Sequence, residues 1–234
     1  MSITLKPKEY YLPEKEIENY KRQFTDKDYK VSEEIVKRVK EFFVEWGYAI
    51  QPKEKEDYKV DFTALKNNIP YPIEIEERKN IKFDSRKEFY PNVHFLARKK
   101  KFLNDGHFIY IIISSTGCMI LRHSSDIFIE GFQKVVPCES TSHTGPDMVY
   151  VHPKSKCYFF NPNTDIRLPV NSRFTYNNKT YKVISLGIYK DENNKQSVEM
   201  CYDFYEENSM KRIITKEVGQ INNLFDKGKI KLLI

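Results

Sequence analysis

A chain of 234 residues with 40% apolar and 14% aromatic residues is long enough to bury a core and has the composition of a globular protein rather than a disordered one. Its net charge of +6 comes from 39 basic and 33 acidic residues, so any basic surface must be local. No apolar run is long enough to cross a bilayer, and four scattered cysteines without CxxC spacing argue against a disulfide scaffold, so we expect an intracellular, cytoplasmic protein of bacterial or phage origin with no membrane partner.

The chain opens with a charged segment and then a helix. Residues 1–30 contain Pro7 and Pro13 and show no clean period, which indicates an arm or a short lead-in helix. From Ser32, a good N-cap, apolar residues recur at helical spacing until Gly47 ends the pattern. These apolar residues are Ile35, Val36, Val39, Phe42, Phe43 and Trp46.

Three strands and a second helix are expected next. The strands cover residues 48–51, 58–65 and 71–78, and Asn67 and Asn68 supply the turn between the last two. An amphipathic helix is predicted over residues 91–103, and the β-branched run over 108–114 indicates a buried strand. The predicted order is therefore αβββαβ.

The remainder of the chain favours short strands. Beyond Asp126, apolar segments alternate with Pro, Gly, Asn and Ser, which predicts a small antiparallel sheet or barrel. We therefore predict an α+β protein with a core over residues 31–135 and a β-rich C-terminal module over 136–234. Five aromatic residues of this module fit its core better than a base-stacking surface: Phe174, Tyr176, Tyr181, Tyr202 and Phe204.

Acidic residues gather on two neighbouring predicted strands. Glu74 and Glu76 alternate with isoleucines, so they share one face while Ile73, Ile75 and Val60 pack on the other. If the strands form a hairpin, Asp61 joins the two glutamates. Such oxygen donors suit Mg²⁺ or Mn²⁺ better than zinc. Two glutamates between isoleucines are equally typical of an ordinary solvent-facing strand, and that alternative stays open.

This arrangement resembles the PD-(D/E)xK (restriction endonuclease-like) nuclease superfamily, over residues 32–126. The resemblance implies an αβββαβ core with a mixed central sheet, in which Asp61 matches the motif Asp and Glu74 the first acidic residue of (D/E)xK. Glu76 stands where the motif has lysine, and no proline precedes Asp61, so the chain is a divergent ExE variant. The resemblance also allows Glu41 or Glu45 of the first helix as a further ligand.

A replacement for the missing lysine is expected in the segment 91–103. At helical spacing Lys99 interrupts an apolar stripe, where it either joins the carboxylates or extends out of the core to solvent. Lys100 and Lys101 fall on the solvated side and suit contacts with the phosphate backbone. Arg98 and His94 either contact phosphate or neutralise surface charge, and the planar fork of Arg98 suits phosphate better.

These observations favour a Mg²⁺-dependent endonuclease that hydrolyses phosphodiester bonds in DNA. Asp61, Glu74 and Glu76 would hold the metal, Lys99 would assist, and double-stranded DNA would be the partner of a possible homodimer. The alternative is a non-catalytic nucleic-acid-binding or assembly protein on a degenerate nuclease fold. A zinc site is a separate, weaker hypothesis based on unusual spacing of four residues: Cys138, His143, His152 and Cys157.

Overall fold

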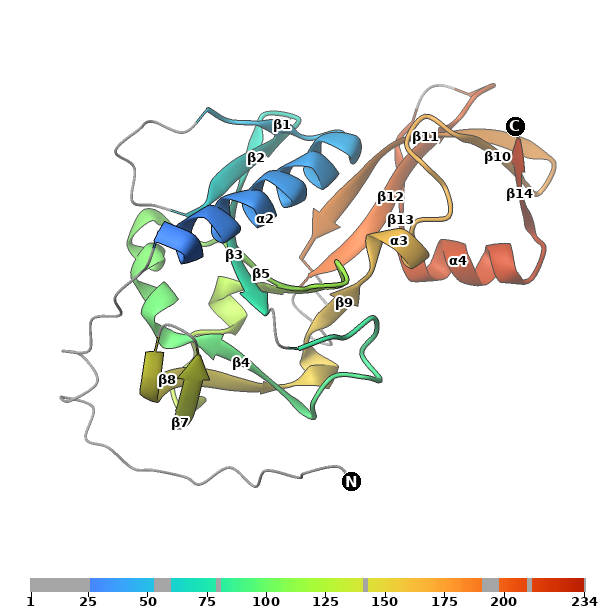
Figure 1. Ribbon diagram of the computed structural model, residues 1–234. Coiled ribbons are helices and arrows are strands. Elements are labelled where there is room, and N and C mark those ends of the chain that lie inside the picture. The colour runs from blue at the N-terminus through green and yellow to red at the C-terminus, as the bar shows by residue number, and fades with distance from the viewer. Residues whose placement is uncertain are drawn as a thin grey trace.

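A computed structural model describes residues 26–52, 60–78, 81–140, 143–190, 198–209 and 212–233, without the side chains of residues 26–32 and 137–147. It is a mixed α+β structure with more strand than helix (Figure 1). The arm predicted over residues 1–30 lies outside this range, except for its last five residues, which are helical. No helix in these ranges has both the length and the apolar character needed to span a bilayer.

The first described element is α2 (Asp26–Glu45), which ends where the sequence predicts. Gly47 follows it with a φ of +91°, a backbone conformation that favours glycine. The predicted start at Ser32 is wrong, since the helix begins six residues earlier. Residues 26–31 contain neither Pro nor Gly, so nothing in them stops the helix from extending toward the N-terminus.

A six-stranded mixed sheet carries the acidic residues. Its strands β3 and β5 run parallel, and all its other neighbours are antiparallel. Asn67 and Asn68 form the tight turn between β2 and β3 with positive φ angles of 52° and 65°, as predicted. In spatial order the strands are β1 (Ala49–Ile50), β2 (Phe62–Lys66), β3 (Ile69–Arg78), β5 (Ile109–Ser114), β6 (Met119–His123) and β9 (Tyr158–Phe160).

The connection from β3 to β5 differs from the prediction. The segment expected as one α-helix forms a strand, β4 (Asn92–Leu96), followed by a 3₁₀ helix, η1 (Ala97–Asp105). The physical reason is a partner far along the chain: β4 pairs with β8 (His143–Pro153), which pairs in turn with β7 (Gln133–Ser140). The alternation of buried Val93 and Phe95 suits that pairing. Two further 3₁₀ turns are η2 (Ser124–Asp126) and η3 (Lys154–Lys156).

The C-terminal part forms an antiparallel five-stranded sheet, in agreement with the predicted small β unit. It lies beside the six-stranded sheet, with α3 (Pro162–Asp165) and α4 (Val218–Asp226) next to it (Figure 1). The boundary predicted between residues 135 and 136 falls inside β7, and β9 still belongs to the first sheet, so the change of sheet comes before β10. The spatial order is β13 (Ile214–Glu217), β12 (Glu199–Glu206), β11 (Lys179–Tyr189), β10 (Arg173–Tyr176) and β14 (Ile230–Leu233).

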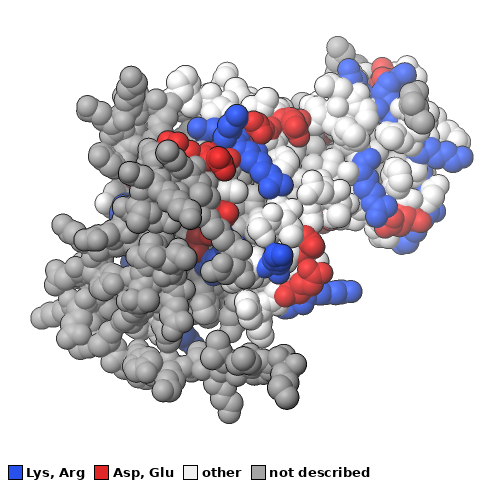
Figure 2. All heavy atoms as spheres, in the orientation of Figure 1, with Lys and Arg blue, Asp and Glu red and all other residues white. Residues whose placement is uncertain are grey.

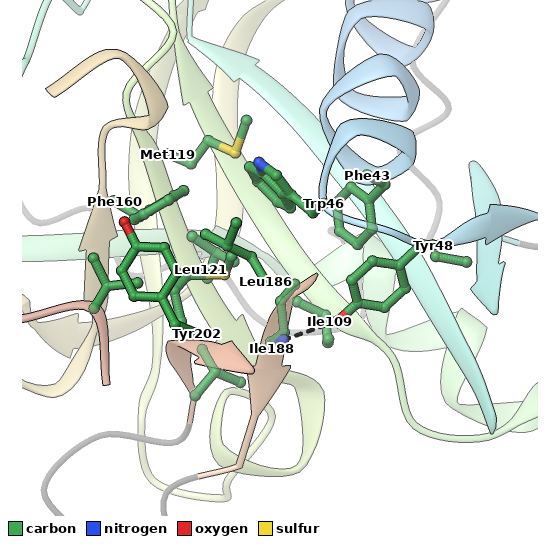
Figure 3. Close-up of a cluster of buried hydrophobic side chains, with 14 of the residues drawn as sticks. Phe43, Trp46, Tyr48, Ile109, Met119, Leu121, Phe160, Leu186, Ile188 and Tyr202 are labelled. Carbon is green, nitrogen blue, oxygen red and sulfur yellow. Dashed lines mark hydrogen bonds between the residues drawn. The ribbon is translucent and has the colours of Figure 1, made fainter. Parts of the chain in front are cut away.

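One hydrophobic cluster joins the two sheets. Figure 3 shows Phe43 of α2 and Trp46, which follows this helix, among side chains of both sheets. The Tyr48 hydroxyl accepts a hydrogen bond of 2.9 Å from the Ile188 amide. The C-terminal aromatics belong to this cluster, as predicted, with Tyr176 at its edge. A second cluster, around Tyr110 and Phe102, covers the other face of the six-stranded sheet. The two faces of β3 therefore have separate environments.

The surface mixes both signs of charge. Figure 2 shows basic side chains next to acidic ones on the visible face, including the part formed by the C-terminal sheet. There Arg173 pairs with Glu207 and Lys179 with Glu206. These pairs offset part of the positive charge that the sequence places in this unit.

Candidate active site

The acidic residues occupy one face of β3, as predicted. Ile73 and Ile75 pack in the cluster under α2, while Glu74 and Glu76 lie on the opposite face. Val60 packs with the second cluster, so the prediction that it accompanies the isoleucines is wrong. It precedes β2, outside the strand alternation on which the prediction relied.

Asp61 and Glu74 lie next to each other. Asp61 immediately precedes Phe62, which pairs with Ile73, so the register of the hairpin carries Asp61 toward Glu74. The Asp61 carboxylate accepts a hydrogen bond of 2.7 Å from the backbone amide of Ile75. The Glu74 carboxylate, in turn, is hydrogen-bonded by the Asp61 backbone. These bonds hold the two carboxylates in place beside the paired strands β2 and β3.

Lys99 completes this group from η1. Its Nζ donates to Oε1 of Glu74, and the same ammonium lies 5.6 Å from the centre of the Phe102 ring. In a 3₁₀ helix, residues three apart lie on one side, so Lys99 and Phe102 face the sheet together. Lys99 therefore points inward, as one of the two predictions had it, although the helix type was wrong.

The carboxyl group of Glu74 has an unusual pKa. Its side chain is only 2% exposed, and this burial, opposed by Lys99 and reinforced by the charge of Asp61, raises its pKa from 4.5 to about 7. Perturbed carboxyl groups of this kind concentrate at functional sites, because a group that titrates near neutral pH can both accept and release a proton.

Glu76 has different partners from those predicted. Its Oε2 accepts from the hydroxyl of the fully buried Tyr110 at 2.5 Å, and its Oε1 from Nε of Arg78 at 2.5 Å. Arg78 also donates to the backbone oxygen of His94 at 2.5 Å. Among the described residues, no three or more His, Cys, Asp or Glu side chains are grouped so that they could hold a metal ion. The structure thus brings together Asp61, Glu74 and Lys99 and ties Glu76 to Arg78.

Arg78 and Tyr110 were not identified from the sequence. Arg78 could have been found, because it follows Glu74 and Glu76 at the same two-residue spacing and shares their face. Tyr110 pairs with Glu74 across the parallel strands β3 and β5, a register that no local pattern specifies. Together they place one cation and one phenol beside the carboxylates.

The predicted nucleic-acid contacts are divided between β4 and η1. His94 and Arg98 are not one helical turn apart, since His94 belongs to β4, where burial and the charge of Arg78 lower its pKa. Arg98 is half-buried, whereas Lys100 and Lys101 are exposed on η1, as expected. Their ammonium groups lie 6.0 Å from the ring centre of Tyr150 and 5.1 Å from that of Phe102.

Two weaker hypotheses find no support in the geometry. Glu41 and Glu45 are exposed on α2, which covers the face of the sheet opposite Glu74, so neither is a ligand there. The side chains of Cys138 and His143 lie outside the described part. Nε2 of His152 lies 2.7 Å from the oxygen of Ile127, while the thiol of Cys157 contacts Arg122 and Pro153.

The chain was compared with protein-family models, with curated proteins and with solved structures. None of them matches it. The case for a function therefore depends on the geometry of this site alone.

Proposed function

We propose that the chain is a metal-dependent endonuclease that hydrolyses phosphodiester bonds in DNA. The observation that carries the proposal is the ion pair between Lys99 and the buried Glu74 beside Asp61, because it joins two neighbouring acidic residues to a cation from η1. In this proposal α2, the hairpins of β1 to β3 and the parallel β5 correspond to a restriction endonuclease-like core. The strand β4 and η1 take the place of its second helix.

The donors present suit a hard divalent cation in part. Asp61 and Glu74 offer neighbouring carboxylates, whose oxygens are the donors that a hard divalent cation prefers. When bound, Mg²⁺ or Mn²⁺ supplies Lewis acidity toward a phosphate oxygen and lowers the pKa of a water. Glu76 fits less well, because Arg78 and Tyr110 already bind its two oxygens.

The remaining residues have distinct roles in this proposal. Glu74, the buried carboxylate that Lys99 contacts, accepts the proton of the attacking water. Lys99 orients that water and stabilises the charge that builds on the phosphoryl oxygens. Glu76 holds Arg78 in place as a positioning residue, and Arg98, Lys100 and Lys101 contact neighbouring phosphates. Cleavage of both strands of a duplex would call for a homodimer with two-fold symmetry.

A cleavage assay tests the proposal with a matched pair of lysine variants. We expect plasmid DNA to be cut in Mg²⁺ and to stay intact in EDTA. Lys99→Met should reduce the rate about a hundredfold, since a cation that stabilises developing charge is lost. Lys216→Met removes an exposed lysine of β13 and should cut at the wild-type rate. Equal rates for the Lys99→Met and wild-type proteins would exclude the assigned role.

The alternative is a nucleic-acid-binding protein that has lost catalysis. It is favoured by the pairing of each glutamate with a cation, Glu74 with Lys99 and Glu76 with Arg78, which leaves each charge already neutralised. This alternative predicts binding that weakens with salt and does not depend on a divalent ion. Cleavage of DNA in Mg²⁺ by the wild-type protein separates the two.

A further inference from the structure

A pocket lies on the same face of the six-stranded sheet as the Asp61, Glu74 and Lys99 group. Its volume is about 260 Å³, and its walls combine apolar surface from Pro72 and Phe102 with polar groups from Gln51, Thr63 and Asp105. Thr63 pairs with Pro72 across β2 and β3, so both contribute to one wall. The pocket is slightly smaller than the roughly 300 Å³ at which sites for drug-sized ligands begin, which suits one flat heterocycle.

The distance from the pocket to the proposed reaction centre is about the length of one nucleotide. Pro72 and Glu74 are two residues apart on the same face of β3, a distance of roughly 7 Å along a strand. The opposite wall, formed by η1, shows a similar separation between Lys99 and the pocket. Lys99, Phe102 and Asp105 follow one another at three-residue spacing along η1. A chain that contacts Lys99 with a phosphate can therefore place its next base in the pocket.

The groups around the pocket match a nucleobase. The backbone amide of Gln51 donates to the oxygen of Thr63 at 2.9 Å, which fixes Gln51 at the rim while its exposed side-chain amide offers both a donor and an acceptor. The Phe102 ring forms part of the wall, and Lys99 and Lys101 lie over it. Aromatic rings beside cations are the common means of binding unpaired bases.

We propose that this pocket receives the base of an unpaired nucleotide next to the bond that is cut. A base stacked inside a duplex cannot enter a recess, so the ligand is a single strand or a nucleotide turned out of the helix. The proposed function supplies the identity of this ligand, since it places a nucleic acid at Lys99. The pocket then selects for unpaired or distorted DNA rather than for a particular duplex sequence.

Binding measured without metal tests the pocket separately from catalysis. The probes are a short fluorescein-labelled single-stranded oligonucleotide and the duplex of the same sequence, and the readout is fluorescence anisotropy in EDTA. We expect the single strand to bind at least about tenfold more tightly than the duplex, given the strength of stacking on aromatic side chains. Thr63→Trp fills the pocket and should abolish this difference. Gln51→Ala should weaken single-strand binding about threefold, as loss of one hydrogen bond does.

Thr175→Trp provides the matched control. Thr175 is a half-buried strand residue like Thr63, but it belongs to β10 in the other sheet, so its variant should bind as the wild type does. The proposal is overturned if Thr63→Trp and Gln51→Ala both bind the single strand normally, if the duplex binds as tightly, or if neither probe binds. Binding that depends on the pocket, together with no cleavage in Mg²⁺, would contradict the nuclease function and support the pocket. Cleavage that depends on Lys99, together with normal binding by both pocket variants, would support the nuclease function and contradict the pocket.

Discussion

The Glu74→Gln variant is expected to lose cleavage and to gain stability. Its rate in Mg²⁺ should fall about a thousandfold, because glutamine cannot accept the proton of the attacking water. Its free energy of unfolding at pH 8 should rise by about 1–3 kcal/mol, because the neutral amide escapes the desolvation that the buried carboxylate suffers. Opposite changes in activity and stability are typical of a group kept for function at the expense of stability.

The pH dependence follows from the direction of the pKa shift. The pKa of Glu74 is raised from 4.5 to about 7 in the folded protein, so the protonated form is favoured by folding. Its contribution to stability is fully present below pH 4.5 and is lost as the pH rises to about 7. Since each pKa unit is worth about 1.4 kcal/mol, the loss is at most roughly 3.5 kcal/mol. The wild type should lose stability over this range, and the gain from Glu74→Gln should disappear below pH 4.5.

Urea unfolding at several pH values measures this effect. Glu206→Gln is a suitable control, because Glu206 pairs with the exposed Lys179 on the surface, where a single ion pair contributes at most about 1 kcal/mol. A Glu74→Gln variant that is less stable than the wild type at pH 8 would show that Glu74 serves mainly as the structural partner of Lys99.

Local patterns were sufficient for the elements whose contacts repeat at a fixed period. The apolar spacing of α2, the Asn67 and Asn68 turn and the buried run of β5 were all predictable, since each depends on neighbours in sequence. The structure of the segment 91–105 was not predictable in this way. Phe95, Lys99 and Phe102 fit a helical period, but β4 is selected by pairing with β8, which lies much later in the chain. A strand that depends on such a partner has no local signature beyond its alternation.

The same distinction applies to the candidate site. The closeness of Asp61 and Glu74 follows from a hairpin and the two-residue period of a strand, both readable from sequence. The partners of Glu76 cannot be deduced in this way, because Tyr110 reaches Glu76 through the register of two parallel strands. That register depends on the whole connection between β3 and β5. Residue types therefore indicated which side chains share a face, and only the tertiary structure decided which of them pair.

Lys66→Met is expected to destabilise the protein by about 3–5 kcal/mol, the usual loss when one partner of a buried ion pair is removed. Lys66 of β2 and Asp203 of β12 form an ion pair between the two sheets, and their side chains are 7% and 4% exposed. The Lys66 ammonium also donates to the oxygen of Leu186 at 3.1 Å. The ammonium group lies 5.4 Å from the ring centre of Tyr48 and 5.4 Å from that of Tyr189.

Asp203 has several hydrogen-bond donors besides Lys66. It accepts hydrogen bonds from the hydroxyls of Ser185, Tyr189 and Thr215 at 2.8 to 2.9 Å. Burial alone would raise its pKa, but the hydrogen bond and charge of Lys66 outweigh that effect and lower it. The stability that this pair contributes is therefore present above the ordinary pKa of an aspartate and is lost in acid.

A double-mutant cycle separates the pair from its surroundings. Asp203→Asn retains the shape of the side chain but leaves the Lys66 ammonium buried without a counter-charge, so it too should destabilise strongly. The double variant Lys66→Met with Asp203→Asn buries no charge and should lose less stability than the sum of the two single losses, with a coupling free energy of about 1–3 kcal/mol from urea unfolding. Additive losses would mean that the two residues contribute independently, and that the hydrophobic cluster shared by the sheets holds them together without this ion pair.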